Sequence, residues 1–154
     1  MGSPSSLLYE DIPRVDMWLK LLLGGIPAVF FVLGIVLLFE NKNIGDVLVA
    51  FGVAIFYVLL FTAIIPRRYQ VYSDRLRIVL GGPFVWNIHF STIKEARSAS
   101  GAKAFAYWGV RLATSSKGVV EIVRSRGCSV VISPSNSGLF LEQLNGALES
   151  VARR

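Results

Sequence analysis

The chain contains two long apolar runs that limit its architecture more than any other feature. They cover Leu19–Phe39 and Ile44–Ile65, 21 and 22 residues, and their only charged residues are Lys20 and Asp46, each near one end of its run. A helix of about 20 apolar residues is long enough to cross the hydrocarbon core of a bilayer, which is roughly 30 Å thick. The remainder of a 154-residue chain is too small to bury two such helices on every side. The two runs therefore predict a membrane-spanning helical hairpin.

The positive residues around the two runs predict an orientation. The link between the runs, Glu40–Asn43, carries one Lys, whereas Arg67 and Arg68 closely follow the second run. Because Lys and Arg near helix ends stay on the cytoplasmic side, we expect a multi-pass protein of the cell membrane with both termini in the cytoplasm. A cleaved signal peptide is the alternative for the first run, but this run is long for such a signal and acidic residues precede it. The predicted division is a short cytoplasmic segment (1–18), a transmembrane hairpin (19–65) and a cytoplasmic domain (66–154).

After the second run the side chains no longer form a continuous apolar stretch. Residues 69–73 and 75–80 alternate apolar and polar side chains around a short Ser73–Asp74 break, which is typical of a tight β-hairpin. Ser115–Gly118 and Ser125–Gly127 have the composition of two further hairpin turns. The other β-rich runs are 84–90, 93–97, 110–114, 119–124 and 129–133. About seven short strands separated by turn residues predict a small antiparallel β-barrel or sandwich.

The last part of the chain has a helical period instead. Apolar residues recur there at the spacing of one helical face, namely Leu141, Leu144, Leu148 and Val151, with Phe140 and Ala147 beside them. Ser135 or Ser137 is expected as the N-cap of this helix. An amphipathic helix can close one open end of a barrel. The predicted fold class is therefore α+β, with a transmembrane hairpin followed by a seven-stranded β domain that a C-terminal helix caps.

The order of these elements and several short motifs resemble those of membrane-anchored bacterial pleckstrin-homology-like (PH-like) proteins. The motifs are Tyr69-x-Val71 before Asp74-x-Leu76-x-Ile78, then Ile88-x-Phe90-Ser91-x-Ile93, Val130-x-Ile132-Ser133-Pro134, and Phe140 with Leu144. The resemblance covers residues 66–150 and implies a seven-stranded barrel with a C-terminal helix, in agreement with the strand and helix pattern. Because the motifs are mostly hydrophobic and turn positions, they identify a fold rather than an activity.

Basic residues concentrate in the predicted domain. Residues 66–154 hold 13 Lys and Arg against 5 Asp and Glu, whereas residues 1–65 hold 3 against 5. A basic segment beside a membrane helix is attracted to anionic lipids, and the candidate contact residues are Arg67, Arg68, Arg75, Arg77 and Lys103. Eukaryotic lipid-binding relatives of the PH-like proteins hold inositol phosphates around a roomy first hairpin loop, but here the corresponding turn is only Ser73–Asp74. We therefore expect unspecific attraction to anionic lipid.

Residues suited to catalysis or metal binding are few. The chain has one His, His89, and one Cys, Cys128, so neither a metal site nor another cofactor is expected. Both residues lie in strand-like segments, where a thiol is commonly a core residue. A Cys–His nucleophilic pair, and with it a hydrolase, is the less favoured alternative. No base-stacking pattern or recognition helix is visible. We expect a protein that is not an enzyme and does not bind nucleic acid.

The segment 98–110 combines small residues with Phe105, Tyr107 and Trp108. These rings either cover the β core, which we favour, or contact lipid headgroups or a partner protein. A domain that is already tethered gains little from another lipid contact, but it meets protein partners at high local concentration. The sequence thus predicts a non-enzymatic interaction or scaffold module at the cytoplasmic membrane face, with protein partners of unknown identity. A lipid-sensing or lipid-binding membrane subunit is the alternative, and a homo-oligomer remains open.

Overall fold

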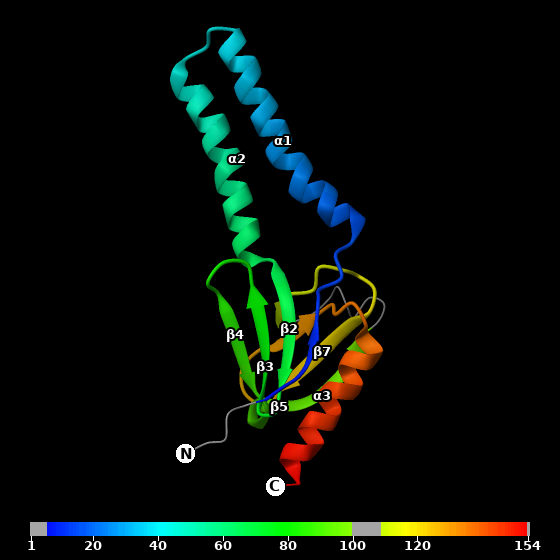
Figure 1. The fold of residues 1–154 in the computed structure, drawn as a ribbon. Coiled ribbons are helices and arrows are strands. Elements are labelled where there is room, and N and C mark those ends of the chain that lie inside the picture. The colour runs from blue at the N-terminus through cyan, green and yellow to red at the C-terminus, as the bar shows by residue number, and fades with distance from the viewer. Residues whose placement is uncertain (1–5, 100–108, 154) are drawn as a thin grey trace. The chain divides into compact units, whose positions relative to one another are not determined.

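The protein divides into two compact units (Figure 1). The computed structural model describes residues 6–99 and 109–153. One unit, Asp16–Ile64, is a helical hairpin, and the other consists of Met1–Val15 together with Ile65–Arg154. All the described strands and the last helix belong to this second unit, which we call the β unit. The segment before the hairpin therefore folds with the domain that follows it, although the sequence analysis did not predict any strand there.

The helical unit confirms the two predicted helices to within two residues. They are α1 (Met17–Phe39) and α2 (Ile44–Ile64). The helices pack closely, because Ala50 and Ala54 of α2 are buried and a Cβ built at Gly34 of α1 would lie 2.9 Å from the ring of Phe51. A glycine at position 34 is thus what allows this ring to approach the backbone of α1.

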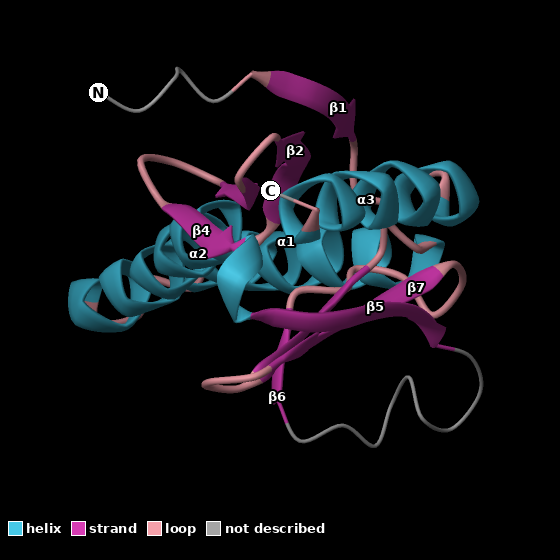
Figure 2. Cartoon of the chain, turned by 90° about the horizontal axis from the view of Figure 1, so that it is seen from below, coloured by secondary structure: helices cyan, strands magenta, loops and turns pink. Residues whose placement is uncertain are grey.

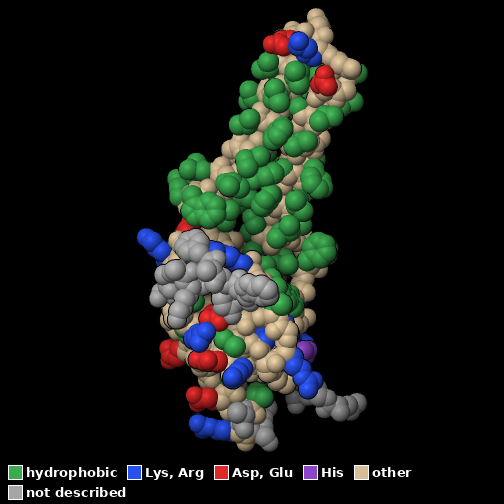
Figure 3. Space-filling model, turned by 180° about the vertical axis from the view of Figure 1, so that it is seen from behind, with side chains coloured by type: hydrophobic (Ala, Val, Ile, Leu, Met, Phe, Trp, Pro, Cys, Tyr) green, Lys and Arg blue, Asp and Glu red, His purple; other side chains and the backbone are tan. Residues whose placement is uncertain are grey.

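The outer surface of the helical unit is apolar. Figure 3 shows hydrophobic side chains over the visible face of the helices, with acidic and basic side chains gathered where the helices connect. Only 6% of the most apolar 18-residue window of α1 and 17% of that of α2 is buried, whereas the core helix of a soluble protein would be mostly buried. Their length and exposed apolar surface indicate that the two helices associate with a membrane.

The β unit contains two four-stranded sheets among the residues that the structure describes. The first sheet has the order β1-β2-β3-β4, with β1 (Leu7–Asp11), β2 (Pro66–Tyr72), β3 (Arg75–Leu80) and β4 (Val85–His89). The second has the order β5-β7-β8-β6, with β5 (Ile93–Ala99), β6 (Gly109–Arg111), β7 (Val119–Arg124) and β8 (Ser129–Ile132). The seven predicted strands are present, but β1 is an eighth. Of the two predicted alternatives, a barrel or a sandwich, a single seven-stranded barrel is wrong, because the strands form two separate sheets.

The prediction that all strands pair in antiparallel fashion is also wrong at β6. This strand pairs with β8 in parallel, with Val110 opposite Val130, so Ser115–Gly118 does not turn back between paired strands. β7 instead lies between β5 and β8 and is antiparallel to both. The Ser125–Gly127 turn does form a hairpin between β7 and β8, as predicted, and Gly127 has a positive φ of 86° that favours glycine.

Alternating residues of the strands form one core. The completely buried members of the strands are Tyr69, Val71, Leu76, Ile78, Ile88, Val120, Ile122, Val130 and Ile132. Because successive side chains of a strand point to opposite faces, Gln70 and Arg77 lie on the outer face of the first sheet. The Tyr69 hydroxyl donates a hydrogen bond to the carbonyl oxygen of Leu112 at 3.2 Å, and burial raises the pKa of this hydroxyl. Tyr69 is therefore a neutral core residue.

The last helix, α3 (Ser137–Ala152), contacts both sheets. Figure 2 shows it between β1 on one side and β5 and β7 on the other. Phe140 and Leu144 are completely buried, whereas Val151 at the end of the predicted apolar face is 37% exposed. The helix thus covers an open side of the β unit, as predicted.

The N-cap of α3 is Asn136, so the predictions of Ser135 and Ser137 are wrong. The side-chain oxygen of Asn136 accepts a hydrogen bond from Leu139 N at 3.2 Å. Asparagine and serine are equally good N-caps, and composition alone could not choose among three adjacent candidates.

The N-terminal segment is joined to the β unit beyond the pairing of β1 with β2. Arg14 N donates to the Ser133 carbonyl oxygen at 2.8 Å, and Ser135 N donates to the Ile12 carbonyl oxygen at 2.9 Å. The Thr114 hydroxyl donates to the Arg14 carbonyl oxygen at 2.6 Å. The segment is therefore bonded to the residues that follow β6 and β8 and to the approach to α3.

Candidate functional site

The four arginines predicted to contact lipid are spread along two adjacent strands. Arg67 and Arg68 lie near the start of β2. Arg75 is the first residue of β3, whose last residue, Leu80, pairs with the first residue of β2. At roughly 3.4 Å per residue, Arg75 is about 17 Å along β3 from that end, with Arg77 in between. Because Arg68 pairs with Val79, Arg75 lies about 14 Å along the sheet from Arg68, beyond the Debye length of about 8 Å at physiological ionic strength, whereas Arg77 lies about 7 Å from it.

A β-bulge exposes the two arginines of β2. Pro66 pairs with Leu80 and Arg68 pairs with Val79, which leaves Arg67 without a partner residue in β3. This extra residue breaks the alternation of the strand. Arg67 and Arg68 are consequently both exposed, and Arg67 forms no ion pair with a residue inside the described ranges.

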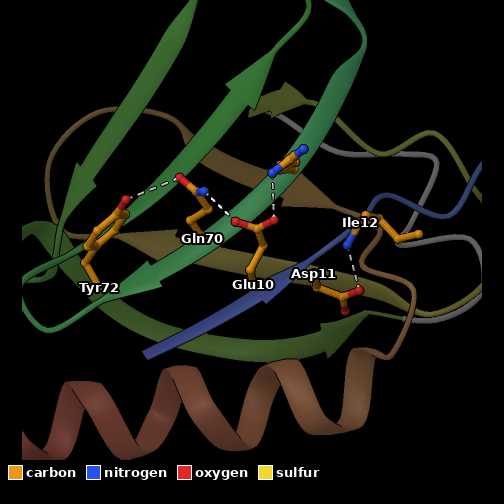
Figure 4. Close-up of polar contacts among 6 residues, drawn as sticks. Glu10, Asp11, Ile12, Gln70 and Tyr72 are labelled. Atoms are coloured by element: carbon orange, nitrogen blue, oxygen red, sulfur yellow. Dashed lines mark hydrogen bonds and ion pairs between the residues drawn. The ribbon is translucent and has the colours of Figure 1, made fainter. Parts of the chain in front are cut away.

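Arg68 is part of a chain of polar side chains from β1 and β2 (Figure 4). Its Nη1 atom lies 3.1 Å from Oε1 of Glu10, Gln70 Nε2 donates to Oε2 of Glu10 at 2.6 Å, and the Tyr72 hydroxyl donates to Gln70 Oε1 at 3.5 Å. The Glu10 carboxylate therefore neutralises Arg68. An exposed ion pair of this kind contributes less than about 1 kcal/mol to stability.

Arg75 is also close to an acidic side chain. Its Nε atom lies 3.9 Å from Oδ1 of Asp74, and its guanidinium carbon lies 5.5 Å from the centre of the Tyr72 ring. The β2–β3 turn consists of Ser73 and Asp74, as predicted. A turn of two residues cannot fold over a polyphosphate headgroup, so the geometry does not favour a phosphoinositide site here.

One end of the first sheet combines exposed cations with exposed apolar side chains. We call it the proximal end and define it as residues 66–68 and 80–85, because Pro66 follows α2 after a single residue. Besides the two arginines, it presents Phe84, which is 56% exposed, and Val85, which is 38% exposed. The sequence analysis identified the two arginines as candidate lipid contacts but placed Phe84 and Val85 only in a strand.

The β3–β4 turn shapes the proximal end. Leu80 N donates to the Phe84 carbonyl oxygen at 3.0 Å, and Gly82 has a φ of 74°, a conformation that glycine adopts without strain. Gly81 N donates to the carbonyl oxygen of Ile65 at 3.0 Å, and Ile65 directly follows the last residue of α2. The turn is therefore held by a main-chain hydrogen bond to the first residue after the helix.

Asp11 is a structural residue that the sequence analysis missed. It is 8% exposed, and its Oδ2 atom accepts a hydrogen bond from Asn136 N at 3.0 Å. Its Oδ1 atom accepts one from Ile12 N at 2.8 Å (Figure 4). The carboxylate thus lies at the N-terminus of α3, where the helix dipole favours negative charge. Burial, with the Asp11 charge, raises the pKa of Tyr9. The only sign of this strand in the sequence is the two-residue spacing of Tyr9 and Asp11.

The remaining predicted contact residues lie outside the described ranges. They are Lys103, Phe105, Tyr107 and Trp108. Whether the three rings cover the core or form a contact surface therefore stays a prediction.

The two residues of the nucleophilic alternative are not brought together. His89 ends β4 in the first sheet, whereas Cys128 precedes β8 in the second, and both are exposed. The prediction that Cys128 is a core residue is therefore wrong. Within the ranges that the structure describes, no group of three or more His, Cys, Asp or Glu side chains could hold a metal ion.

Two open sheets with a C-terminal helix, and a short β2–β3 hairpin within the first sheet, are the features expected of a PH-like protein. A family model described as "Bacterial PH domain" matches residues 67–147, which is more than half of the chain. The chain therefore belongs to the bacterial PH domain family, which confirms the resemblance seen in its sequence. No curated protein and no solved structure matches the chain. The matched range begins after α2, so β1 is an addition to the matched domain.

Proposed function

We propose that this protein is a non-enzymatic interaction module tethered to the cell membrane. In this proposal α1 and α2 span the bilayer, and the β unit lies at the cytoplasmic face, where it scaffolds protein partners. Membership of the bacterial PH domain family supports a role in protein or lipid interaction. The observation that carries the proposal is the pairing of β1, which precedes the helices, with β2, which follows them.

This pairing restricts how the chain can cross a membrane. A folded sheet lies in one compartment, so the chain between β1 and β2 crosses the bilayer an even number of times. Two apolar helices of 23 and 21 residues meet this condition. Cleavage within or after α1 would detach β1 from the first sheet, so the pairing argues against a signal peptide.

The charges favour the cytoplasmic side for the β unit. Arg67 and Arg68 lie just after α2, whereas the connection between the helices carries Lys42 with Glu40 only 4.0 Å from it, and Asp46 nearby. Positive residues that flank a membrane helix remain in the cytoplasm, and acidic residues contribute little to orientation. The arginine pair therefore favours a connection that faces outward.

A tethered β unit can meet partners through the edges of its sheets. β4 is an edge strand of the first sheet among the strands described, and an edge strand offers main-chain donors and acceptors to a partner strand. Tethering raises the local concentration of the unit near other membrane proteins, which allows weak contacts to be effective.

The topology can be tested with cysteine accessibility in intact cells that express the protein. Cys128 is exposed in the β unit and is the only cysteine. A membrane-impermeant maleimide should label it only after the cells are permeabilised. In a second variant, with Cys128→Ser and Lys42→Cys, the same reagent should label intact cells. Labelling of Cys128 in intact cells would reverse the proposed orientation, and protection of position 42 would show that the hairpin does not cross the bilayer.

A lipid-binding membrane subunit remains the second candidate, and the exposed Arg67 and Arg68 favour it. If lipid binding is the function, the purified full chain should retain one anionic lipid in preference to others of equal charge after a wash in about 0.5 M salt, where the Debye length is about 4 Å. We expect no such preference, because bulk electrostatic attraction is lost under these conditions. A retained headgroup preference would favour this candidate over the scaffold.

A further inference from the structure

We infer that the proximal end is a second membrane-contact surface, in which the Phe84 side chain enters the interface of the bilayer close to the point where α2 leaves it. The partner is the lipid surface itself. This inference rests on the proposed function, because it requires that α2 spans the membrane. It adds a contact made by the β unit to those made by the two helices.

The hydrogen bond between Gly81 N and the Ile65 carbonyl oxygen carries the argument. Ile65 directly follows the last residue of α2, so it lies at the boundary where a spanning helix leaves the hydrocarbon core. The 3.0 Å bond fixes the β3–β4 turn to this residue. Because two or three residues cover only about 10 Å at most, Phe84 lies within the headgroup layer or next to it.

The chemistry of the proximal end suits that layer. No charged residue lies between Arg77 and His89, and Phe84 is more than half exposed although its neighbours Leu80 and Trp86 pack against the core. Exposed aromatic and aliphatic side chains beside arginines are typical of surfaces that lie in a membrane interface. The Phe84 ring can enter the interface while Arg67, the residue of the β2 bulge that Glu10 does not neutralise, contacts the phosphates.

The turn at the opposite end of β3 differs from the proximal end in each of these respects. The β2–β3 turn consists of Ser73 and the acidic Asp74, and it carries no apolar side chain. It therefore provides an internal control, because both turns belong to the same sheet and lie at opposite ends of β3.

The experiment places one environment-sensitive fluorophore on the full chain in nanodiscs that contain anionic lipid and nitroxide-labelled acyl chains. Each variant carries Cys128→Ser and one new cysteine, at Phe84, at Val85, at Asp74, or at Phe56 in α2, where the side chain is 66% exposed. Phe84→Cys and Phe56→Cys are matched substitutions. Val85→Cys tests the same surface if the change at Phe84 disturbs the turn.

At positions 84, 85 and 56 we expect emission at shorter wavelength, because the fluorophore lies in apolar surroundings, and quenching by the nitroxide lipids. We expect neither effect at position 74. Quenching at 56 without quenching at 84 or 85 would overturn this inference and leave the proposed tether intact. If position 84 were protected from aqueous iodide yet not quenched by lipid, the turn would contact protein instead. Quenching at 74 as strongly as at 84 would refute a contact specific to the proximal end. Absence of quenching at 56 would refute the membrane tether itself.

Discussion

Replacing Asp11 by Ala should destabilise the β unit by about 2–3 kcal/mol. The carboxylate accepts two main-chain hydrogen bonds, from Ile12 N at 2.8 Å and from Asn136 N at 3.0 Å. Hydrogen bonds to a charged group contribute about 1.5–3 kcal/mol each. We use values at or slightly below the low end, because both donors belong to exposed residues and water can replace part of each bond. Loss of the negative charge at the N-terminus of α3 is included in this figure.

The assay is a urea titration of the full chain in detergent micelles. Trp86 packs against the core of the β unit, so its fluorescence reports unfolding there once Trp18 and Trp108 are changed to Phe. Asp11→Asn should give an intermediate loss, because the amide retains one oxygen acceptor. Glu10→Ala is the matched control, since Glu10 precedes Asp11 in β1 and forms an exposed ion pair with Arg68 that contributes less than about 1 kcal/mol. If Asp11→Ala and Glu10→Ala shift the urea midpoint equally, Asp11 does not hold β1 to α3.

Two further predictions test the packing of the β unit and of the helical hairpin, each with one substitution and one control. Leu144 is completely buried, so Leu144→Asp should cost several kcal/mol in the same titration, on the order of the penalty for a buried charge. The control Leu139→Asp, at a position 39% exposed, should have a small effect. Equal shifts of the urea midpoint for the two variants would contradict the placement of α3. In the hairpin, Gly34→Ala should lower the thermal midpoint of the helical circular dichroism signal in detergent by forcing the Phe51 ring away, at about 1–3 kcal/mol. Gly25→Ala, whose added Cβ meets nothing within 4 Å, should leave that midpoint unchanged or raise it, and a decrease for both variants would mean that the contact with Phe51 is not responsible.

The sequence by itself determined the elements whose burial pattern is local. The length of the apolar runs predicted α1 and α2 to within two residues, and the period of the side chains predicted the seven strands after residue 66 and α3. In each of these elements the apolar residues follow a pattern that is complete within a few consecutive residues, so a short window of sequence is enough to identify the element.

Only the tertiary structure decided which strands pair. β1 has five residues, and its partner on β2 is remote in sequence, since Glu10 and Arg68 are 58 residues apart. The parallel pairing of β6 with β8 likewise depends on which sheet edge is available after β7 has paired with β5 and β8. Such pairings are decided by the packing of the whole unit, and the intrinsic preference of a short strand contributes little to them.

The dependence on strand pairing also explains why the sequence did not predict which residues of the candidate site lie together. The sequence identified Arg67, Arg68, Arg75 and Arg77 as one basic group because they are close along the chain, but the extended strands place Arg75 about 14 Å from Arg68 along the sheet. The β-bulge that exposes Arg67 depends on the register of β2 against β3, and the hydrogen bond from Gly81 to Ile65 joins the residue after β3 to the residue before β2. The distribution of apolar and basic residues along the chain therefore determined that a basic domain follows two long apolar helices, and the pairing of the strands decided that Arg67 and Arg68 share the proximal end with Phe84.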